Sequence, residues 1–409
     1  MKIISDLHIH SKYSRATSPR MDLDNLSLFG AMKGLQLIGT GDALHPKWFK
    51  ELSDNLVNHN DGIYSLKSKE STYPKFVITT EVATICEYDS KYRKSHHLIL
   101  FPDLDSAYQA SNSLSSYGSL SSDGRPILSL SPPELVDNLI SVNNLIEIIP
   151  AHIWTPWWSI LGSKSGYDSL NDCYQDSSKH IHAIETGLSS DPPMNWRISE
   201  LDNLTIISNS DCHSPDPYRL GREANIFELS SLSYYDIIQV IRLNDPNQFI
   251  MTIETKPEYG KYHWTGHRNC GVSMSPSDSF KINDICPKCN KSMTVGVEQR
   301  ISSLSDYPIG HIRPSSPKFV YLLPLHEIIS TSLGLNSFLS KKVQMIYSTL
   351  ITNFHNEFSI LLNVPLIEIQ KIAGYKIMKI IESMRNDTFS VIPGYDGVYG
   401  SLESNYNSV

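Results

Sequence analysis

The sequence of 409 residues predicts a mixed α/β fold that begins with a β/α barrel, and three observations support that prediction. Short apolar runs recur along the first 255 residues at intervals suited to a helix between strands. Several of these runs end in a carboxylate or an imidazole, as in barrels whose functional site lies at the C-terminal ends of the strands. The first run, residues 1–10, carries two histidines separated by one residue.

His8 and His10 are the strongest single indication of function. Alternate side chains of a strand project from the same face, so both imidazoles can bind one divalent cation while Leu7 and Ile9 pack elsewhere. The alternative is a strand with two hydrogen-bonded histidines, and for an isolated pair that alternative is favoured. The later apolar runs favour metal binding over hydrogen-bonded histidines, because they supply further ligands.

These further ligands occur at the ends of four apolar runs, 37–42, 76–81, 147–152 and 204–213, and at the start of a fifth, 97–101. The candidate side chains are Asp42, Glu81, His97, His152, Asp211 and His213.

This order of residues resembles the polymerase-and-histidinol-phosphatase (PHP) family of multinuclear metal phosphoesterases, over roughly the first 255 residues. The resemblance implies a distorted seven-stranded β/α barrel with two or three bound metals. It places the first metal on His8, His10, Glu81 and Asp211, the second on Glu81, His97 and His152, and a third on Asp42 and His213. Some relatives have another histidine where this chain has Ala16, which departs from the pattern for the third metal.

Four stretches, residues 6–17, 39–48, 150–157 and 393–400, are more specifically similar to the endonuclease Q family, and this resemblance runs nearly end to end. That family nicks DNA on the 5′ side of deaminated bases and abasic sites. The resemblance therefore implies a metal-dependent DNA repair endonuclease acting on uracil, hypoxanthine, xanthine or abasic sites. Two alternatives stay open, a PHP-type small-molecule phosphoesterase and a DNA-binding protein with an inactive metal site.

The expected chemistry needs no nucleophilic serine or cysteine. Water between two cations has its pKa lowered towards about 7, which provides hydroxide for attack on a phosphodiester. We expect Zn²⁺ in the catalytic site, with Mg²⁺ or Mn²⁺ as alternatives.

A second metal site is predicted from four residues in the middle of the chain. His267 and Cys270 form one chelating pair, and Cys286 and Cys289 form another after fifteen intervening residues. This spacing fits a structural zinc site with one histidine and three cysteines. His263 is the rival fourth ligand, and His267 is preferred on spacing.

The chain divides into three predicted domains. Residues 1–255 form the metal-dependent catalytic barrel, residues 256–300 form the zinc-binding, cysteine-rich segment, and residues 301–409 form a C-terminal helical region assigned to DNA binding. Apolar residues fall at helical spacing in that last region. The assignment to DNA binding comes from the endonuclease Q resemblance, and an ordinary helical bundle is equally compatible with the pattern.

Composition limits the partners. A formal net charge of −8 opposes a generally basic DNA-binding surface, but bound cations would reverse the local potential at the site. We expect double- or single-stranded DNA as the partner and no membrane. No signal peptide or long apolar span is apparent, so a cytoplasmic location is expected. No clear sliding-clamp motif is present, and a sliding clamp stays an open partner.

Candidate DNA contacts lie near the ligand motifs. Tryptophans there could stack on an unpaired base if exposed, and would only fill the barrel if buried. Basic side chains could contact phosphates and polar ones could read a base, although surface or turn roles are equally common for them. The candidates are Lys12, Arg15, Trp48, Trp154, Trp157, Ser189, Arg197, Asn209, Arg219 and Arg222.

Overall fold

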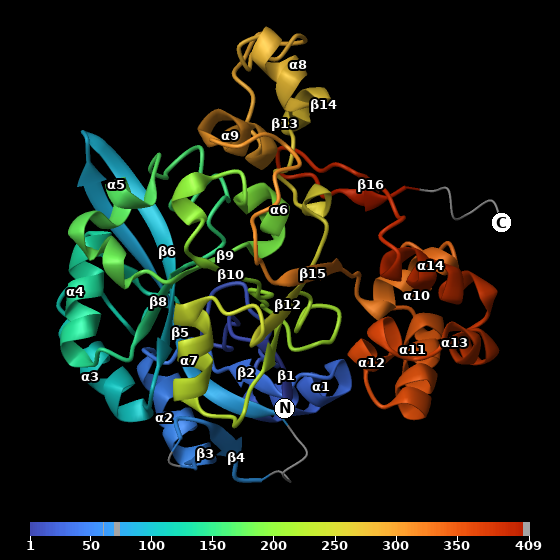
Figure 1. Ribbon diagram of the computed structural model, residues 1–409, viewed down its shortest axis with the longest axis horizontal. Coiled ribbons are helices and arrows are strands. Elements are labelled where there is room, and N and C mark those ends of the chain that lie inside the picture. The colour runs from blue at the N-terminus through green and yellow to red at the C-terminus, as the bar shows by residue number, and fades with distance from the viewer. Residues whose placement is uncertain (60, 69–73, 404–409) are drawn as a thin grey trace.

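A large mixed sheet with helices packed around it forms the centre of the molecule in the computed structural model, which describes residues 1–59, 61–68 and 74–403 (Figure 1). Hydrogen-bonded neighbours follow the order β15-β12-β11-β1-β2-β5-β4-β3, and β6, β7 and β8 join through β5 and β6. A mixed α/β fold with a large central sheet is therefore present, as predicted. The strands of this sheet are β1 (Lys2–Asp6), β2 (Leu37–Gly39), β3 (Leu56–Asn58), β4 (Tyr64–Leu66), β5 (Lys75–Tyr88), β6 (Lys91–Phe101), β7 (Ile127–Leu128), β8 (Glu147–Pro150), β11 (Ala224–Glu228), β12 (Phe249–Glu254) and β15 (Lys318–Tyr321).

Among the described residues, the ladder of hydrogen-bonded strands does not close on itself. β9 (Ala183–Glu185) and β10 (Thr205–Ile207) form a separate parallel pair. The chain after β10 returns to the segment that follows β1, where the His10 amide donates to the Cys212 carbonyl at 3.1 Å. The hydrogen-bonded sheet contains both parallel and antiparallel neighbours. The seven-stranded barrel stays a prediction.

The helices over the sheet begin and end at residues with ordinary capping chemistry. The Asp22 side chain accepts from the Asn25 amide at the start of α1, and Gly34 ends that helix with φ of 100°. Ser131 and Glu134 form a reciprocal capping box at the start of α4, which satisfies amide donors that the helix leaves free. The helices of this part are α1 (Leu23–Lys33), α2 (Pro46–Asn55), α3 (Leu104–Leu114), α4 (Pro132–Val142), α5 (Leu170–Tyr174), α6 (Pro192–Asn195) and α7 (Tyr234–Leu243).

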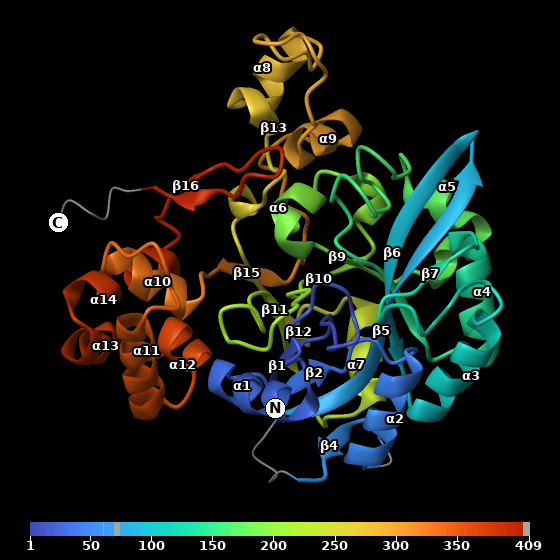
Figure 2. The same ribbon diagram turned by 180° about the vertical axis from the view of Figure 1, so that it is seen from behind.

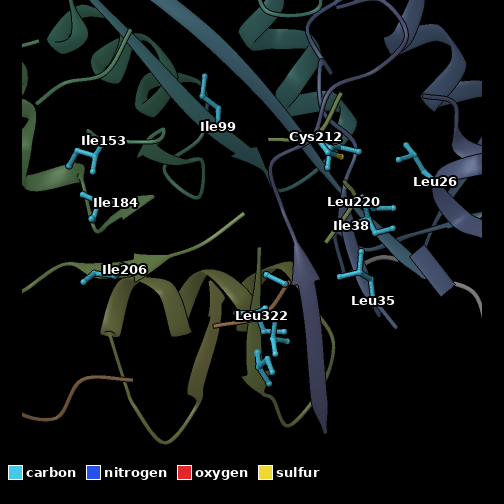
Figure 3. Packing of buried hydrophobic residues seen from close by; sticks show 14 of the residues in the cluster. Leu26, Leu35, Ile38, Ile99, Ile153, Ile184, Ile206, Cys212, Leu220 and Leu322 are labelled. Carbon is cyan, nitrogen blue, oxygen red and sulfur yellow. The ribbon is translucent and has the colours of Figure 1, made fainter. Parts of the chain in front are cut away.

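The buried apolar side chains form one large cluster, a smaller one that includes α7, and a third, of three residues, in the cysteine-rich segment. Figure 3 shows part of the large cluster, in which Ile38 of β2, Ile99 of β6 and Ile206 of β10 are labelled. Because these strands are distant in sequence, their packing holds the strand ends around a common centre.

The cysteine-rich segment projects from one end of the sheet (Figures 1 and 2). The C-terminal helices lie to one side of the sheet. The segment contains β13 (Thr265–His267), β14 (Val272–Met274) and α8 (Pro276–Lys281), and α9 (Val297–Leu304) runs across its predicted end. The helical region contains α10 (Leu325–Ser332), α11 (Lys341–Phe354), α12 (Glu357–Leu362), α13 (Leu366–Ala373) and α14 (Tyr375–Arg385), followed by β16 (Val391–Ile392) and β17 (Ser401–Leu402). The predicted boundaries at 255/256 and 300/301 stay proposals.

The C-terminal helical region is joined to the first part by a strand and a buried ion pair. β15 pairs in parallel with β12 of the central sheet. The Lys33 ammonium at the end of α1 lies 2.7 Å from Glu357 of α12, and both side chains are buried. Glu357 also accepts from the Leu325 amide at 3.0 Å. No helix among the described residues is long and apolar enough to span a membrane.

A pair of buried carboxyl groups lies where β11 meets β12. The Ser208 hydroxyl is 3.1 Å from Glu223 and 2.8 Å from Glu254. Burial raises the pKa of Glu254 to about 8, and burial together with Glu254 raises the pKa of Glu223. Two adjacent carboxyl groups away from water cannot both ionise cheaply, so the pair carries at least one proton at neutral pH.

This pair predicts a loss of stability as the pH rises from 5 to 8. The unfolded chain ionises Glu254 near its ordinary pKa of 4.5, whereas the folded chain keeps the proton until about pH 8. The stabilisation is therefore complete below pH 4.5 and lost by about pH 8. Glu254→Gln should flatten the slope of unfolding free energy against pH by about 1 kcal/mol per unit, measured by urea denaturation. Exposed Glu87→Gln is the control, and equal slopes for both variants would contradict a shared buried proton.

Candidate metal centre

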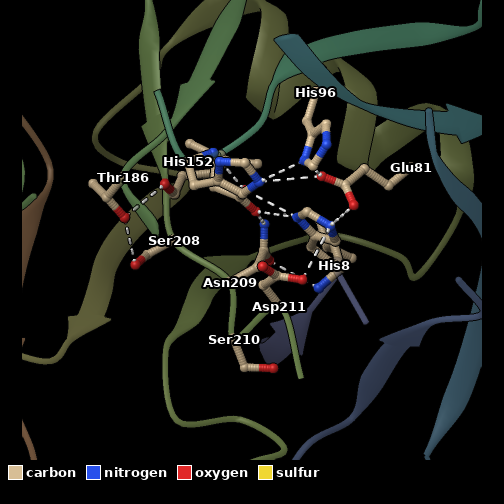
Figure 4. A network of polar contacts seen from close by, with 12 residues as sticks. His8, Glu81, His96, His152, Thr186, Ser208, Asn209, Ser210 and Asp211 are labelled. Atoms are coloured by element: carbon tan, nitrogen blue, oxygen red, sulfur yellow. Dashed lines mark hydrogen bonds and ion pairs between the residues drawn. The ribbon is translucent and has the colours of Figure 1, made fainter. Parts of the chain in front are cut away.

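One buried carboxylate, Glu81 near the middle of β5, connects two groups of ligand side chains (Figure 4). The first group is His8, His10, Glu81 and Asp211, and the second is Glu81, His96 and His152. Within each group the ligand atoms lie within 4.8 Å of one another. The structure thus brings together side chains from the N-terminal strand, the β5–β6 hairpin and the loops after β8 and β10.

The first group combines two imidazoles with two carboxylates. His10 Nε2 lies 3.0 Å from Asp211 Oδ1 and 3.2 Å from Glu81 Oε2. His8 Nε2 lies 3.6 Å from Glu81 Oε2 and 3.7 Å from Asp211 Oδ1. These four residues are the predicted ligands of the first metal, and the structure places all of them together.

The second group corrects one predicted residue. His96 Nδ1 lies 2.8 Å from Glu81 Oε1 and 3.2 Å from His152 Nε2, and His152 Nε2 is 3.1 Å from Glu81 Oε1. The predicted ligand His97 instead contacts Thr84 at 3.0 Å and the Tyr174 hydroxyl at 2.8 Å.

The register of the β5–β6 hairpin explains this difference. Ala83 is opposite His96 and Val82 is opposite His97. Side chains directly opposite in an antiparallel pair share a face, and a shift of one residue exchanges the faces. Ala83 shares its face with Glu81, so His96 faces the site while His97 points into the packing on the other side.

Both groups fit divalent cations. The buried His8 Nε2 has no hydrogen-bond partner among the described residues, which is costly for a polar atom unless something binds it. Ligand atoms about 2.1 Å from a tetrahedral cation are about 3.4 Å apart, and the N···O separations of 3.0–3.7 Å in the first group bracket that value. The two groups therefore suggest metal binding.

The protonation properties of the site agree with this. Burial alone would lower the pKa of His8, but the carboxylates of Glu185, Glu81 and Asp211 raise it well above its ordinary value. Burial would raise the pKa of Glu81, yet His96, Arg125 and His8 hold it well below the usual range. Burial lowers the pKa of His96 to about 4, so this imidazole is neutral at pH 7. The carboxylates thus stay ionised and attract positive charge to the centre.

Three residues of the site region have unusual backbone conformations. Asp42, His152 and Asp211 have φ values of 50°, 32° and 46°. Non-glycine residues rarely adopt positive φ, and such strain concentrates at functional sites. Each of them follows a strand, so the backbone turns sharply where its side chain enters the site region.

The predicted third metal is not assembled in the described residues. Asp42 Oδ1 lies 3.0 Å from His10 Nδ1, on the opposite side of that ring from Glu81 and Asp211. Its other oxygen accepts from the Ser11 amide at 2.6 Å and the Ser14 hydroxyl at 2.9 Å. His213 packs beside His10 with ring centroids 4.5 Å apart. Asp42 therefore orients a ligand histidine, and neither residue joins a described group of three ligands.

Sequence reasoning missed two charged residues of the site. Both oxygens of Glu185, at the end of β9, lie 3.0 Å from His8 Nδ1, and one accepts from the His152 amide at 2.9 Å. Arg125 Nη1 lies 3.0 Å from Glu81 Oε2. Glu185 ends an apolar strand, which is the pattern that identified Glu81, and could have been found by it. Arg125 follows a serine-rich loop and carries no comparable signal.

The second predicted metal site is also brought together. His267, Cys270, Cys286 and Cys289 have ligand atoms within 4.8 Å of one another, and Cys289 Sγ is 3.4 Å from His267 Nδ1. The rival His263 is buried outside this group. One histidine and three thiols at this spacing suggest a structural metal site.

The comparisons with known proteins agree with this geometry. The crystal structure of the lesion-specific endonuclease PfuEndoQ from Pyrococcus furiosus matches with a TM-score of 0.88 and 32% identity, over 100% of this chain and 97% of that one. The chain belongs to the endonuclease Q family. A structure of Endonuclease Q in complex with a 27-mer duplex that has an abasic lesion at the active site matches equally well, with 33% identity over 100% and 98% of the two chains.

Two further matches each cover part of the chain of this endonuclease Q family member. Residues 324–388, which include α10 to α14, match the family model described as MJ0043 C-terminal domain. The uncharacterized protein MJ0043 from Methanocaldococcus jannaschii is 36% identical over 251 residues, which are 61% of this chain. The chain spans about a third of the length of that relative, 31%.

Two of the three tryptophans predicted to contact DNA are buried. Trp48 and Trp154 have no exposed surface, and their indole nitrogens donate to the Gly41 carbonyl and to Asn195, each at 2.8 Å. They cannot stack on a base and instead pack in the core, which corrects the prediction. Trp157 is 42% exposed and lines a cavity of about 250 Å³ with Ser189, His96 and His152.

The predicted polar contacts also divide into buried and accessible residues. Arg197 is buried in an ion pair with Glu298 at 2.7 Å, and the Asn209 side chain is buried against Leu7 and Glu185. Both are therefore structural. Arg219 and Arg222 line a cavity of about 290 Å³ with Asp211 and His213. Lys12 pairs with Glu51, and Arg15 lies near Asp123 with 79% of its side chain exposed.

The adjacent histidines of β6 provide a test of the centre. His96→Ala should lower the metal content of the N-terminal centre, because it removes a ligand atom beside Glu81 and His152. His97→Ala should keep that metal and lower only the melting temperature, since it empties a packed position. Metal content after dialysis, measured by inductively coupled plasma mass spectrometry, distinguishes the variants. Equal metal loss in both would contradict the observed register.

The cysteine-rich segment gives a separate prediction. Cys289→Ser should release about one equivalent of zinc and lower the melting temperature, because a small segment with little core depends on its metal for folding. The control is Cys86→Ser, which changes a thiol outside both ligand groups. Unchanged zinc content in Cys289→Ser would show that these four residues do not bind zinc.

Proposed function

We propose that this protein is a metal-dependent DNA repair endonuclease that nicks the phosphodiester bond on the 5′ side of deaminated bases and abasic sites. The observation that carries the proposal is the full-length similarity to Endonuclease Q in complex with a duplex that has an abasic lesion at its active site. The two ligand groups around Glu81 supply a site suited to phosphodiester hydrolysis. Asp211 also lines two cavities, so the first ligand group opens onto both of them.

The side chains of the site have distinct roles in this proposal. His8, His10, His96, His152, Glu81 and Asp211 would hold two divalent cations, with Zn²⁺ favoured by the imidazoles and Mg²⁺ or Mn²⁺ as alternatives. Cations bound there would lower the pKa of water and offset the charge that develops on the phosphate. The expected products have a 3′ hydroxyl and a 5′ phosphate.

The surrounding residues orient the ligand histidines and add a positive charge beside Glu81. Glu185 and Asp42 each hold the outer ring nitrogen of a ligand histidine, His8 and His10 respectively, which directs Nε2 into the centre. Arg125 keeps a positive charge beside Glu81, because the Glu81 carboxylate more than offsets the cost of burying the guanidinium and raises its pKa. It is placed to attract a non-bridging phosphate oxygen.

The cavity beside the second ligand group is the proposed lesion pocket. Its lining combines Trp157, Trp158 and Tyr262 with the polar side chains of Thr155 and Ser189. Enzymes that act on one base commonly extrude it from the duplex, and a mispaired or missing base costs less to extrude. Uracil, hypoxanthine and xanthine, which carry a carbonyl in place of an amino group, are the proposed bases.

The other parts of the chain extend the proposed DNA surface. Arg219 and Arg222 line a cavity next to Asp211 and His213, where they can contact phosphates of the strand being cut. We assign the C-terminal helical region to duplex binding, and the cysteine-rich segment to a structural role with one bound zinc.

A nicking assay tests this function. A labelled duplex with one uracil or abasic site should be cut on the 5′ side of the lesion, while the matched thymine duplex stays intact. Raising the salt concentration from 50 to 200 mM should slow cleavage at low DNA concentration severalfold or more, because phosphate contacts depend on salt. Equal cutting of damaged and intact DNA would leave a general nuclease. Hydrolysis of small phosphate monoesters without nicking would favour a phosphatase, and neither reaction would favour an inactive DNA-binding protein.

A further inference from the structure

A loop near the C-terminus, residues 393–400, lies against the cysteine-rich segment beside the proposed lesion pocket. Figures 1 and 2 show β16, which precedes this loop, between that segment and the C-terminal helices. The Gly394 and Gly400 amides donate to the carbonyls of Glu258 and Tyr259, at 2.8 and 3.1 Å. A Cβ atom at Gly400 would lie 2.1 Å from the Glu258 carbonyl oxygen. Only glycine permits this close approach.

Tyr399 in this loop lies at the junction of three cavities. It lines the proposed lesion pocket with His96, His152 and Trp157, and the arginine-lined cavity with Asp211 and Arg219. It also lines a third cavity, of about 290 Å³, between the loop and α10. The side chain is 60% exposed. Tyr399 therefore lies on the border between the lesion pocket and the proposed path of the phosphates.

One side chain of the loop, the Asp396 carboxylate, adds to these backbone bonds with the cysteine-rich segment. Its Oδ2 accepts from the Arg268 amide at 2.6 Å, and its Oδ1 accepts from the Thr294 hydroxyl at 2.7 Å. Arg268 lies between His267 and Cys270, two of the candidate zinc ligands. The Gly397 amide adds a bond to the Lys261 carbonyl at 2.8 Å. The place of Tyr399 thus depends on the fold of the cysteine-rich segment.

We propose that Tyr399 is the wall of the lesion pocket against which the extruded base stacks, and that Asp396 is the positioning residue that holds this wall in place. The inference rests on the proposed function and extends it. An aromatic ring stacks on any base, because every base has a π face. A wall between the pocket and the arginine-lined cavity would hold the base on one side while its phosphate lies on the other side, beside Arg219. The cysteine-rich segment then has a role in lesion selectivity besides its own stability.

The ratio of kcat/KM for a uracil duplex to kcat/KM for an abasic duplex tests the stacking. Tyr399→Ala should lower this ratio about tenfold, because only the uracil substrate has a base to stack. Tyr399→Phe retains the ring and should keep the ratio within about twofold of the wild type. Tyr92→Ala is the control, since Tyr92 is a 70% exposed tyrosine on β6 that lines none of these three cavities. An unchanged ratio in Tyr399→Ala, or an equal loss on both substrates, would overturn the proposal.

A second variant tests the attachment of the loop. Asp396→Ala should lower the same ratio while the zinc content of the purified protein stays unchanged. A normal ratio in this variant would remove the positioning role of Asp396, and lost zinc would show that the effect arises from the metal site. If wild-type protein cuts neither duplex, the proposed function itself is wrong. If it cuts both and Tyr399→Ala has the wild-type ratio, only the present inference is wrong.

Discussion

The two oxygens of the buried Glu81 carboxylate face different sets of imidazoles, and the arrangement of the centre depends on this single side chain. Oε2 faces His8 and His10 of the N-terminal strand, whereas Oε1 faces His96 and His152. An ionised carboxylate with no exposed surface is costly unless positive charge compensates it. Arg125 supplies part of that charge, and cations bound among the imidazoles would supply more.

Contacts between segments far from each other in sequence hold together the regions around this centre. The buried Lys33–Glu357 ion pair joins the C-terminal helices to α1, and removal of either partner would leave an uncompensated buried charge. Asp396 ties the loop at residues 393–400 to the cysteine-rich segment on another side. The loop at residues 393–400 therefore lines cavities beside the centre through Tyr399.

The sequence allowed much of the centre to be predicted because its ligands follow strands. His8, His10, Glu81, His152 and Asp211 were identified from apolar runs and their ends, and the structure brings them together. The second site, at His267 and the three cysteines, was identified from spacing alone. The prediction from apolar runs was wrong for His97. Adjacent residues of a strand point to opposite faces, and the sequence of two neighbouring histidines does not show which one faces inward.

Local patterns thus determined the mixed α/β class, most of the candidate ligands and the family resemblance, since each of these is visible in residues close together in the chain. Tertiary structure decided what depends on contacts between distant segments. The hairpin register selected His96, the packing around the central sheet buried Trp48 and Trp154, and Asp42 became a partner of His10. Tyr399 reached the centre from the other end of the chain, because backbone bonds to residues 258–261 and Asp396 hold its loop there. No local pattern encodes which distant surface a loop will pack against.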